Sequence, residues 1–217
     1  MNRCVIIAGA DINNYENAKK YLKDDDFIIC CDCGLRHLQK LNVKPNLIVG
    51  DFDSHQNPHL PVETIVLPCE KDDTDTGFAV KEALKRGAND FLFLGVIGNR
   101  FDHSFANISI LLMLDTLGKS ALAIDDFSEL QIISSQKAFI SDDFSFFSLL
   151  NVSGTAEGIS IKNAKYPLEN AIIKSEDQYG ISNQVLPNQI AEVSIQKGRL
   201  LLIRKKKKMT FVFFIII

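Results

Sequence analysis

The chain has 217 residues, of which 46% are hydrophobic and 24% are charged, and its formal net charge at pH 7 is −3. This composition excludes a disordered chain and allows one large domain or two small ones with a buried core. The net negative charge provides no basic field for a phosphate backbone, so we expect no nucleic-acid partner.

Short apolar runs alternate with helical patterns through the first half of the chain, which predicts an α/β domain. Because several of these runs are apolar without alternation, we expect a mainly parallel, Rossmann-like sheet. Thr74 and Gly87 are typical start and stop residues for one helix, and another, 103–117, is apolar almost all round and is expected to be central and buried. The expected strands are 4–9, 27–32, 46–51, 64–68, 91–96 and 121–125, and the expected helices are 14–23, 34–41, 75–86 and 103–117.

From about Ser128 the pattern changes to short β-rich segments punctuated by Gly, Asn and Pro. This pattern predicts an antiparallel β-sandwich. The expected strands lie in the segments 130–134, 144–150, 158–163, 170–175 and 191–204. We therefore predict an α/β domain over residues 1–126 followed by a β-sandwich domain over residues 127–217.

The cysteines and the N-terminus indicate a cytoplasmic protein with reduced thiols and no membrane span. The apolar run at the N-terminus is too short for a secretory signal, and the five cysteines lack framework spacing. A structural zinc at "CCDC" (30–33) is an alternative, although no second Cys or His pair stands at a ligand spacing. The apolar tail 211–217 is too short to cross a bilayer, so we expect a final strand, with a membrane-surface tail as the alternative.

Polar residues follow the predicted strands at the points where the strands end. In an open parallel sheet the ligand crevice lies at that edge, so five loops distant in sequence would converge on one site. The residues concerned are Asp11, Asp32, Asp51, Asp53, Asp72, Asp73, Asp75, Arg100, Asp102 and His103.

Asp51 and Asp53 are separated by one residue in "IVGDFDS" (48–54). In an extended segment they would point the same way, and with Asp75 they would hold one hard divalent cation, for which Mg²⁺ is the natural candidate. In the alternative interpretation, Asp51 is a turn residue and Asp53 a helix cap.

The segment "GNRFDHSFAN" (98–107) places Arg100, Asp102 and His103 where a loop enters a helix. The start of a helix favours anions, and Arg100 would suit a phosphate. His103 has an alternative interpretation as an ordinary helix residue with a satisfied hydrogen bond. The chain contains neither GxxxxGK[ST] nor GxGxxG, so we expect neither a P-loop nor a conventional dinucleotide site.

Several motifs together resemble those of the thiamine pyrophosphokinase family. They are "CDCGLRHL" (31–38), "KPNLIVGDFDS" (44–54), "EKDDTDT" (70–76), "GNRFDHSFAN" (98–107), "AKYPLEN" (164–170) and "GISN" (180–183). Their order and spacing cover nearly the whole chain to about Arg204. The resemblance implies transfer of diphosphate from ATP to the hydroxyl of thiamine, with release of AMP, a requirement for Mg²⁺, and a homodimer with active sites between subunits.

The resemblance also implies roles for individual residues. It suggests an ATP- and Mg²⁺-binding catalytic domain over 1–126 and a thiamine-binding domain over 127–217. Asp51, Asp53 and Asp75 would be magnesium ligands and, with Asp102, catalytic residues. The expected ATP contacts are Asp32, Arg36, Lys71, Asp72, Arg100 and His103, and the expected thiamine contacts are Asp102, Ser182 and Asn183.

Three departures from the family motifs affect these assignments. Cys33 and Asn99 stand where the family has glycines, and Asn163-Ala164 replaces a usual Gly-Leu pair. The side chains of the first two would reduce the space in which the backbone approaches a phosphate, which affects the assignments of Asp32 and Arg36 most.

Two other functions stay open: a metal-dependent nucleotide-sugar glycosyltransferase, and a non-catalytic thiamine- or nucleotide-binding module.

Overall fold

The computed structural model describes residues 3–53, 59–70 and 72–207, and the chain divides into two compact units, Met1–Ile132 and Ile133–Ile217. The sequence predicted a boundary between residues 126 and 127, before the strand that follows. In the structure this strand, β7 (Ser128–Ile133), pairs antiparallel with β6 (Ser120–Ile124), and Ala123 faces Leu130. The first unit therefore keeps almost the whole of β7.

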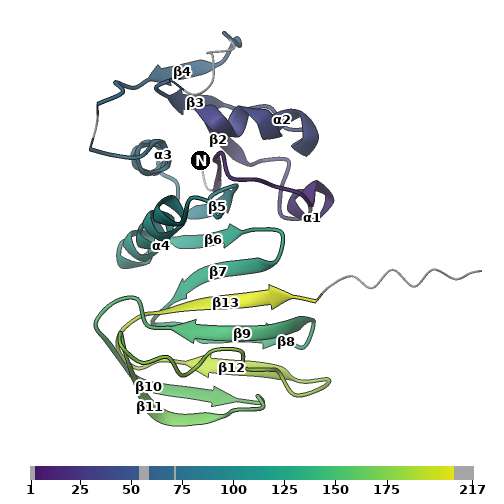
Figure 1. Cartoon of the computed structure of the whole chain (residues 1–217), viewed down its shortest axis with the longest axis vertical. Coiled ribbons are helices and arrows are strands. Elements are labelled where there is room, and N and C mark those ends of the chain that lie inside the picture. Colours follow the sequence, from purple (N-terminus) through teal and green to yellow (C-terminus); the bar gives the residue numbers. More distant parts are fainter. Residues whose placement is uncertain (1–2, 54–58, 71, 208–217) are drawn as a thin grey trace, which may run out of the picture. The chain divides into compact units, whose positions relative to one another are not determined.

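The first unit is built on a mainly parallel sheet with the strand order β4-β3-β2-β1-β5-β6-β7 (Figure 1). Neighbouring strands from β4 to β6 are parallel, as the unbroken apolar runs predicted, and side chains such as Val5, Ile29 and Phe93 are almost completely buried. The remaining strands are β1 (Arg3–Ile7), β2 (Phe27–Cys31), β3 (Leu47–Gly50), β4 (Glu63–Val66) and β5 (Asp90–Leu94).

Four α-helices cover the faces of this sheet (Figure 1). The first two pack Ala18, Leu38 and Leu41 onto one sheet face, while the third contacts β1, β2 and β3 and the fourth contacts β6. Their bounds are α1 (Tyr15–Lys19), α2 (Leu35–Leu41), α3 (Asp75–Lys85) and α4 (Phe101–Thr116). The first is shorter than the predicted 14–23.

The prediction that the fourth helix is central and buried was wrong. Only one stripe of α4 is buried, formed by Ser104, Asn107, Leu111 and Leu114, which recur at helical spacing. Phe101 is 76% exposed and Phe105 is 56% exposed. The sequence alone did not reveal this, because a helix that is apolar all round can still bury a single face.

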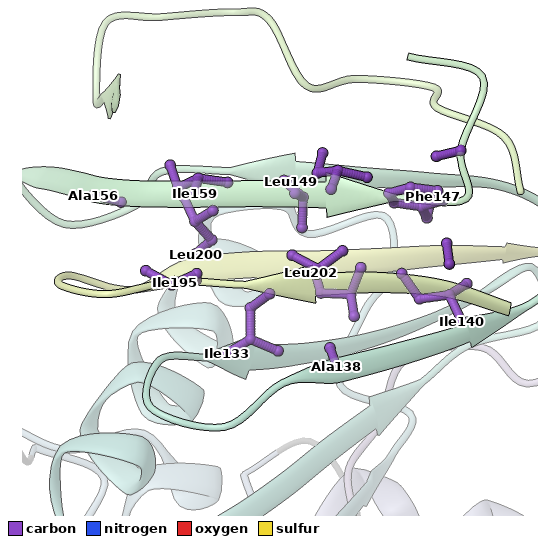
Figure 2. Close-up of a cluster of buried hydrophobic side chains, with 14 of the residues drawn as sticks. Ile133, Ala138, Ile140, Phe147, Leu149, Ala156, Ile159, Ile195, Leu200 and Leu202 are labelled. Carbon is purple, nitrogen blue, oxygen red and sulfur yellow. The ribbon is translucent and has the colours of Figure 1, made fainter. Parts of the chain in front are cut away.

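The second unit contains two groups of antiparallel strands. One is a sheet with the order β11-β10-β12-β8, and the other is the pair of β9 and β13. Figure 2 shows the core between them, in which Phe147, Leu149, Ile159 and Leu202 are nearly or completely buried. The bounds are β8 (Ala138–Ser141), β9 (Phe144–Leu150), β10 (Thr155–Lys162), β11 (Leu168–Lys174), β12 (Ile190–Ser194) and β13 (Leu200–Lys206).

The predicted β-sandwich is confirmed, with two differences in detail. The short strand β8 was not predicted, and the segment 191–204 forms two strands instead of one. Gly198 lies between those strands with φ +93°, and a Cβ there would lie 2.6 Å from the Thr155 carbonyl oxygen. A turn that needs glycine therefore separates the two strands.

All five cysteines are free thiols, as predicted. Cys4, Cys30 and Cys31 are buried strand residues, and burial raises the pKa of each thiol. Across the described ranges, no helix combines the length and the apolar character needed to cross a membrane. The predicted terminal strand at 211–217 lies outside the described residues.

Candidate active site

A large open cleft lies beyond the carboxyl ends of the parallel strands of the first unit. The strand order reverses between β1 and β5, which is the point where open α/β sheets bind their ligands. The cleft has a volume of about 660 Å³. Its lining comes from the loops after β1 to β5, represented by Asp11, Asp32, Asp51, Asp73 and Arg100, so the predicted convergence of five loops is confirmed.

Three carboxylates from three of these loops meet in the cleft. Asp32 begins the short 3-10 helix η1 (Asp32–Gly34) after β2, Asp51 directly follows β3, and Asp75 is the first residue of α3. Each residue offers an oxygen, and the three oxygens lie within 4.8 Å of one another. Asp32 is only 3% exposed, whereas Asp51 and Asp75 are half-buried.

Local sequence explains how these acids come so close. A Cβ on Gly50 would lie 2.5 Å from the Cβ of Asp32, so only glycine allows β3 to pass the Asp32 side chain. Thr74 caps α3, as predicted, because its Oγ1 accepts a hydrogen bond from the Gly77 N–H at 3.1 Å. This cap places Asp75 at the first helical position.

The donor set of this group fits a hard divalent cation. Carboxylate oxygens are the preferred ligands of Mg²⁺, and three of them provide the negative charge that such an ion needs. Asp32, Asp51 and Asp75 would hold the ion.

Asp53 lines the same cleft but does not belong to the group of three. The reason is Phe52, whose φ of 58° lies in the left-handed region. The segment from Asp51 to Asp53 is therefore not extended, so its backbone does not direct both side chains the same way. Instead, the Asp53 backbone N–H donates a hydrogen bond to Asp51 Oδ1, and the nitrogen and oxygen are 3.3 Å apart.

Two arginines among the predicted ATP contacts also line the cleft. The Arg36 guanidinium donates to the Gly9 carbonyl and, at 2.7 Å, to Asp11 Oδ1. Arg100 donates to both carboxylate oxygens of Asp102, at 3.1 and 2.7 Å. These bonds hold the pKa of Asp102 well below its usual range.

The other predicted ATP contacts lie in different settings. His103 lines the cleft, whereas Asp72 is exposed and does not belong to the lining, and Lys71 lies outside the described residues. Asp73, which was not assigned a role, lines the cleft and forms an ion pair with Lys81 at 2.6 Å.

The residues that replace two family glycines, Cys33 and Asn99, both line the cleft. Cys33 fits because Gly9 faces it, and a side chain on Gly9 would collide with the Cys33 Cβ. Burial raises the pKa of the Cys33 thiol to about 11, and the neighbouring Asp32 adds to this shift. The thiol is therefore protonated at neutral pH.

Two polar residues of α4 were missed by the sequence analysis. The Ser104 Oγ accepts a hydrogen bond from the Gly98 N–H at 3.0 Å, and Asn107 Nδ2 donates to the Val96 carbonyl at 2.8 Å. Both residues hold the loop that presents Asn99 and Arg100 to the cleft. A detectable signal was present, because both are polar residues on the stripe of α4 that carries Leu111 and Leu114.

The predicted thiamine contacts of the second unit differ in exposure. Ser182 is exposed, with φ 59°, whereas Asn183 is only 3% exposed. The Asn183 side chain accepts from the Tyr166 N–H at 3.0 Å and donates to the Tyr166 carbonyl at 2.8 Å. Asn183 thus fixes the loop that contains Tyr166, and its contact with thiamine stays a prediction.

Two family models match the chain. One describes the catalytic domain of thiamin pyrophosphokinase and matches residues 18–122, and the other describes its vitamin B1 binding domain and matches residues 132–200. Together they cover well over half of the chain. The chain belongs to the thiamin pyrophosphokinase family. This family consists of diphosphotransferase enzymes, so the resemblance found in the sequence is confirmed and the glycosyltransferase alternative is set aside.

Individual thiamin pyrophosphokinases are similar over nearly the full length. The thiamine pyrophosphokinase of Bacillus subtilis is 27% identical over 207 residues, which are 92% of this chain and 96% of the relative. A crystal structure from the same organism has a TM-score of 0.82 at 24% identity and covers 95% of this chain and 100% of its own. The structure from Candida albicans has a TM-score of 0.73 at 17% identity, covering 95% and 89%. These solved structures confirm the predicted fold class.

Proposed function

We propose that this chain transfers the diphosphate of ATP to the hydroxyl of thiamine and produces thiamine diphosphate and AMP. The main support is the group formed by Asp32, Asp51 and Asp75 in the cleft of a unit that matches the family's catalytic domain. The thiamine hydroxyl oxygen would bond to the β-phosphorus, and the bond from this phosphorus to the α,β-bridging oxygen would break in line.

The residues of the cleft would position and neutralise the triphosphate. Mg²⁺, when bound by the three aspartates, would neutralise charge on the moving diphosphate. Arg36 and Arg100, which line the cleft, are suited to phosphate oxygens because the guanidinium offers paired donors. Lys71, Asp72 and His103 remain proposed ATP contacts, and Asp53 remains a proposed metal ligand.

The hydroxyl proton needs an acceptor, and the candidates are Asp102 and the aspartates of the metal group. Asp102 accepts from Arg100 with both oxygens, and its pKa is lowered by these bonds. A carboxylate with a lowered pKa is a weaker base. A carboxylate bound to Mg²⁺ is a weaker base for the same reason, so Asp102 and the aspartates of the metal group both stay proposed acceptors. Asp102, Ser182 and Asn183 are the proposed thiamine contacts.

We further propose a cytoplasmic homodimer with active sites between subunits. The support is the family membership. ATP and thiamine are the proposed substrates, and neither nucleic acid nor membrane is a proposed partner.

A product assay tests this function. Purified chain, ATP, Mg²⁺ and thiamine should yield AMP and thiamine diphosphate in equal amounts, because one diphosphate moves in each turnover. Chelation of Mg²⁺ should stop both products. ADP as the product would contradict diphosphoryl transfer, and ATP binding without any product would favour the non-catalytic module.

A further inference from the structure

His37 is a buried polar residue of α2 that does not itself line the cleft. Its exposed fraction is 2%, yet its neighbour Arg36 reaches the cleft. A buried imidazole is costly unless both ring nitrogens find partners. The partners of His37 therefore indicate what this side chain holds in place.

Both ring nitrogens of His37 are engaged. Nε2 lies 3.0 Å from the Ala10 carbonyl oxygen, and Nδ1 lies 2.7 Å from the Tyr15 hydroxyl. Arg36 Nε also lies 3.3 Å from Nε2, where its N–H could bond only to an unprotonated nitrogen. The contact with the Ala10 carbonyl is shorter, and a carbonyl oxygen can only accept, so we place the proton on Nε2, and Nδ1 accepts from Tyr15. Burial, followed by the charge of Arg36, lowers the pKa of His37, which keeps the ring neutral in this tautomer.

The carbonyl that His37 holds belongs to the wall of the cleft. Segment 8–11 lines the cleft after β1, and the Ala10 N–H donates to the Gly95 carbonyl at 2.8 Å on the other side. Ala10 is thus fixed between α2 and the loop after β5. The same segment supplies the Gly9 carbonyl and the Asp11 carboxylate that orient Arg36.

We propose that His37 is a positioning residue for nucleotide binding, which acts by holding the Ala10 carbonyl and thereby fixes segment 8–11 and the Arg36 guanidinium. The proposal rests on the proposed function, in which this cleft binds ATP. A loop held in its bound geometry loses less conformational freedom when the ligand binds. Loss of this restraint should weaken ATP binding more than it slows the chemical step.

Variants of the full chain test this role by titration with ATP and Mg²⁺ in the calorimeter and by steady-state kinetics. His37→Leu should weaken ATP binding about tenfold, the order expected for one lost hydrogen bond. The KM for ATP should rise in parallel, while kcat at saturating ATP and the KM for thiamine should change little. His37→Gln, whose side-chain amide can still donate to the Ala10 carbonyl, should recover most of the affinity.

Leu41→Val is the matched control, because Leu41 is equally buried on the same helix, belongs to its hydrophobic core cluster and cannot donate a hydrogen bond to segment 8–11. It should lower the melting temperature without weakening ATP binding. If His37→Leu does not fold, His37→Asn serves in its place, since its shorter amide does not reach the carbonyl.

Three results would overturn the role of His37. They are wild-type ATP affinity in His37→Leu, an equal loss in Leu41→Val, and no recovery in His37→Gln. Wild-type chain that binds no ATP would overturn both the proposed function and this role. ATP binding with the predicted order of variants, but without AMP or thiamine diphosphate, would overturn the function alone and support the role.

Discussion

The Asp51 carboxylate lies in a group of three acids whose oxygens are within 4.8 Å of one another, and two like charges at that distance repel by about 3 kcal/mol at an effective dielectric near 20. Asp51→Asn should therefore leave the free energy of unfolding without Mg²⁺ unchanged or raise it by about 1 kcal/mol, after screening by cleft water. In the wild-type chain, bound Mg²⁺ should raise the free energy of unfolding. Asp51→Asn should abolish this rise and reduce turnover by orders of magnitude. Thermal denaturation with and without Mg²⁺, together with the product assay, checks this.

Asp53→Asn tests whether Asp53 is also a metal ligand, because Asp53 lines the cleft but lies outside the group of three carboxylates. If Asp32, Asp51 and Asp75 alone hold the ion, Asp53→Asn should keep the stabilisation by Mg²⁺. Loss of that stabilisation would restore Asp53 to the ligand set that the sequence predicted. Unfolding of Asp51→Asn would instead support the interpretation of Asp51 as a turn residue.

The helix α3 connects local sequence to the metal group, because its first residue, Asp75, is a proposed ligand. Thr74→Ala removes the hydroxyl that accepts from the Gly77 N–H and should cost about 1 kcal/mol of unfolding free energy. Because the helix start would fray, the apparent affinity for Mg²⁺ should fall as well. Denaturant unfolding and Mg²⁺ titration measure the two effects.

Thr74→Ser is the control for the cap, since it keeps the hydroxyl and removes only a methyl group. It should restore both the stability and the Mg²⁺ affinity. Equal losses in the Ala and Ser variants would show that the methyl group of Thr74, and not its hydrogen bond, supports the start of α3.

The last described strand sets where the chain can be shortened. In β13, Lys206 pairs with Phe144, and the Ser145 Oγ donates to the Lys206 carbonyl at 3.3 Å. A cut after Lys205 would remove Lys206, which is paired with β9. We expect a chain that ends at Lys207 to retain full activity and thermal stability.

A shorter chain that ends at Ile203 provides the contrast for this truncation. It loses the pairing of Arg204, Lys205 and Lys206 with β9, so its melting temperature should fall by several degrees. Melting curves and the product assay compare the three chains. An inactive chain ending at Lys207 would show that the residues beyond it contribute to function.

Local patterns were sufficient to predict most elements of this protein. Unbroken apolar runs marked the parallel strands, and Thr74 marked the start of α3, because burial and capping act over a few neighbouring residues. The convergence of the five loops also followed from sequence, since parallel strands all end at one edge. The family was recognisable from the order of its motifs.

Other features depended on contacts between distant segments and were decided only by the tertiary structure. The left-handed Phe52 separates Asp53 from the carboxylate group, while Gly50 admits Asp32 to it, and neither effect is visible in the spacing of the acids. The exposed face of α4 and the role of His37 likewise depend on what lies opposite each side chain. A sequence pattern states which side chains are apolar or charged, but the partners of each side chain are fixed only when the chain folds.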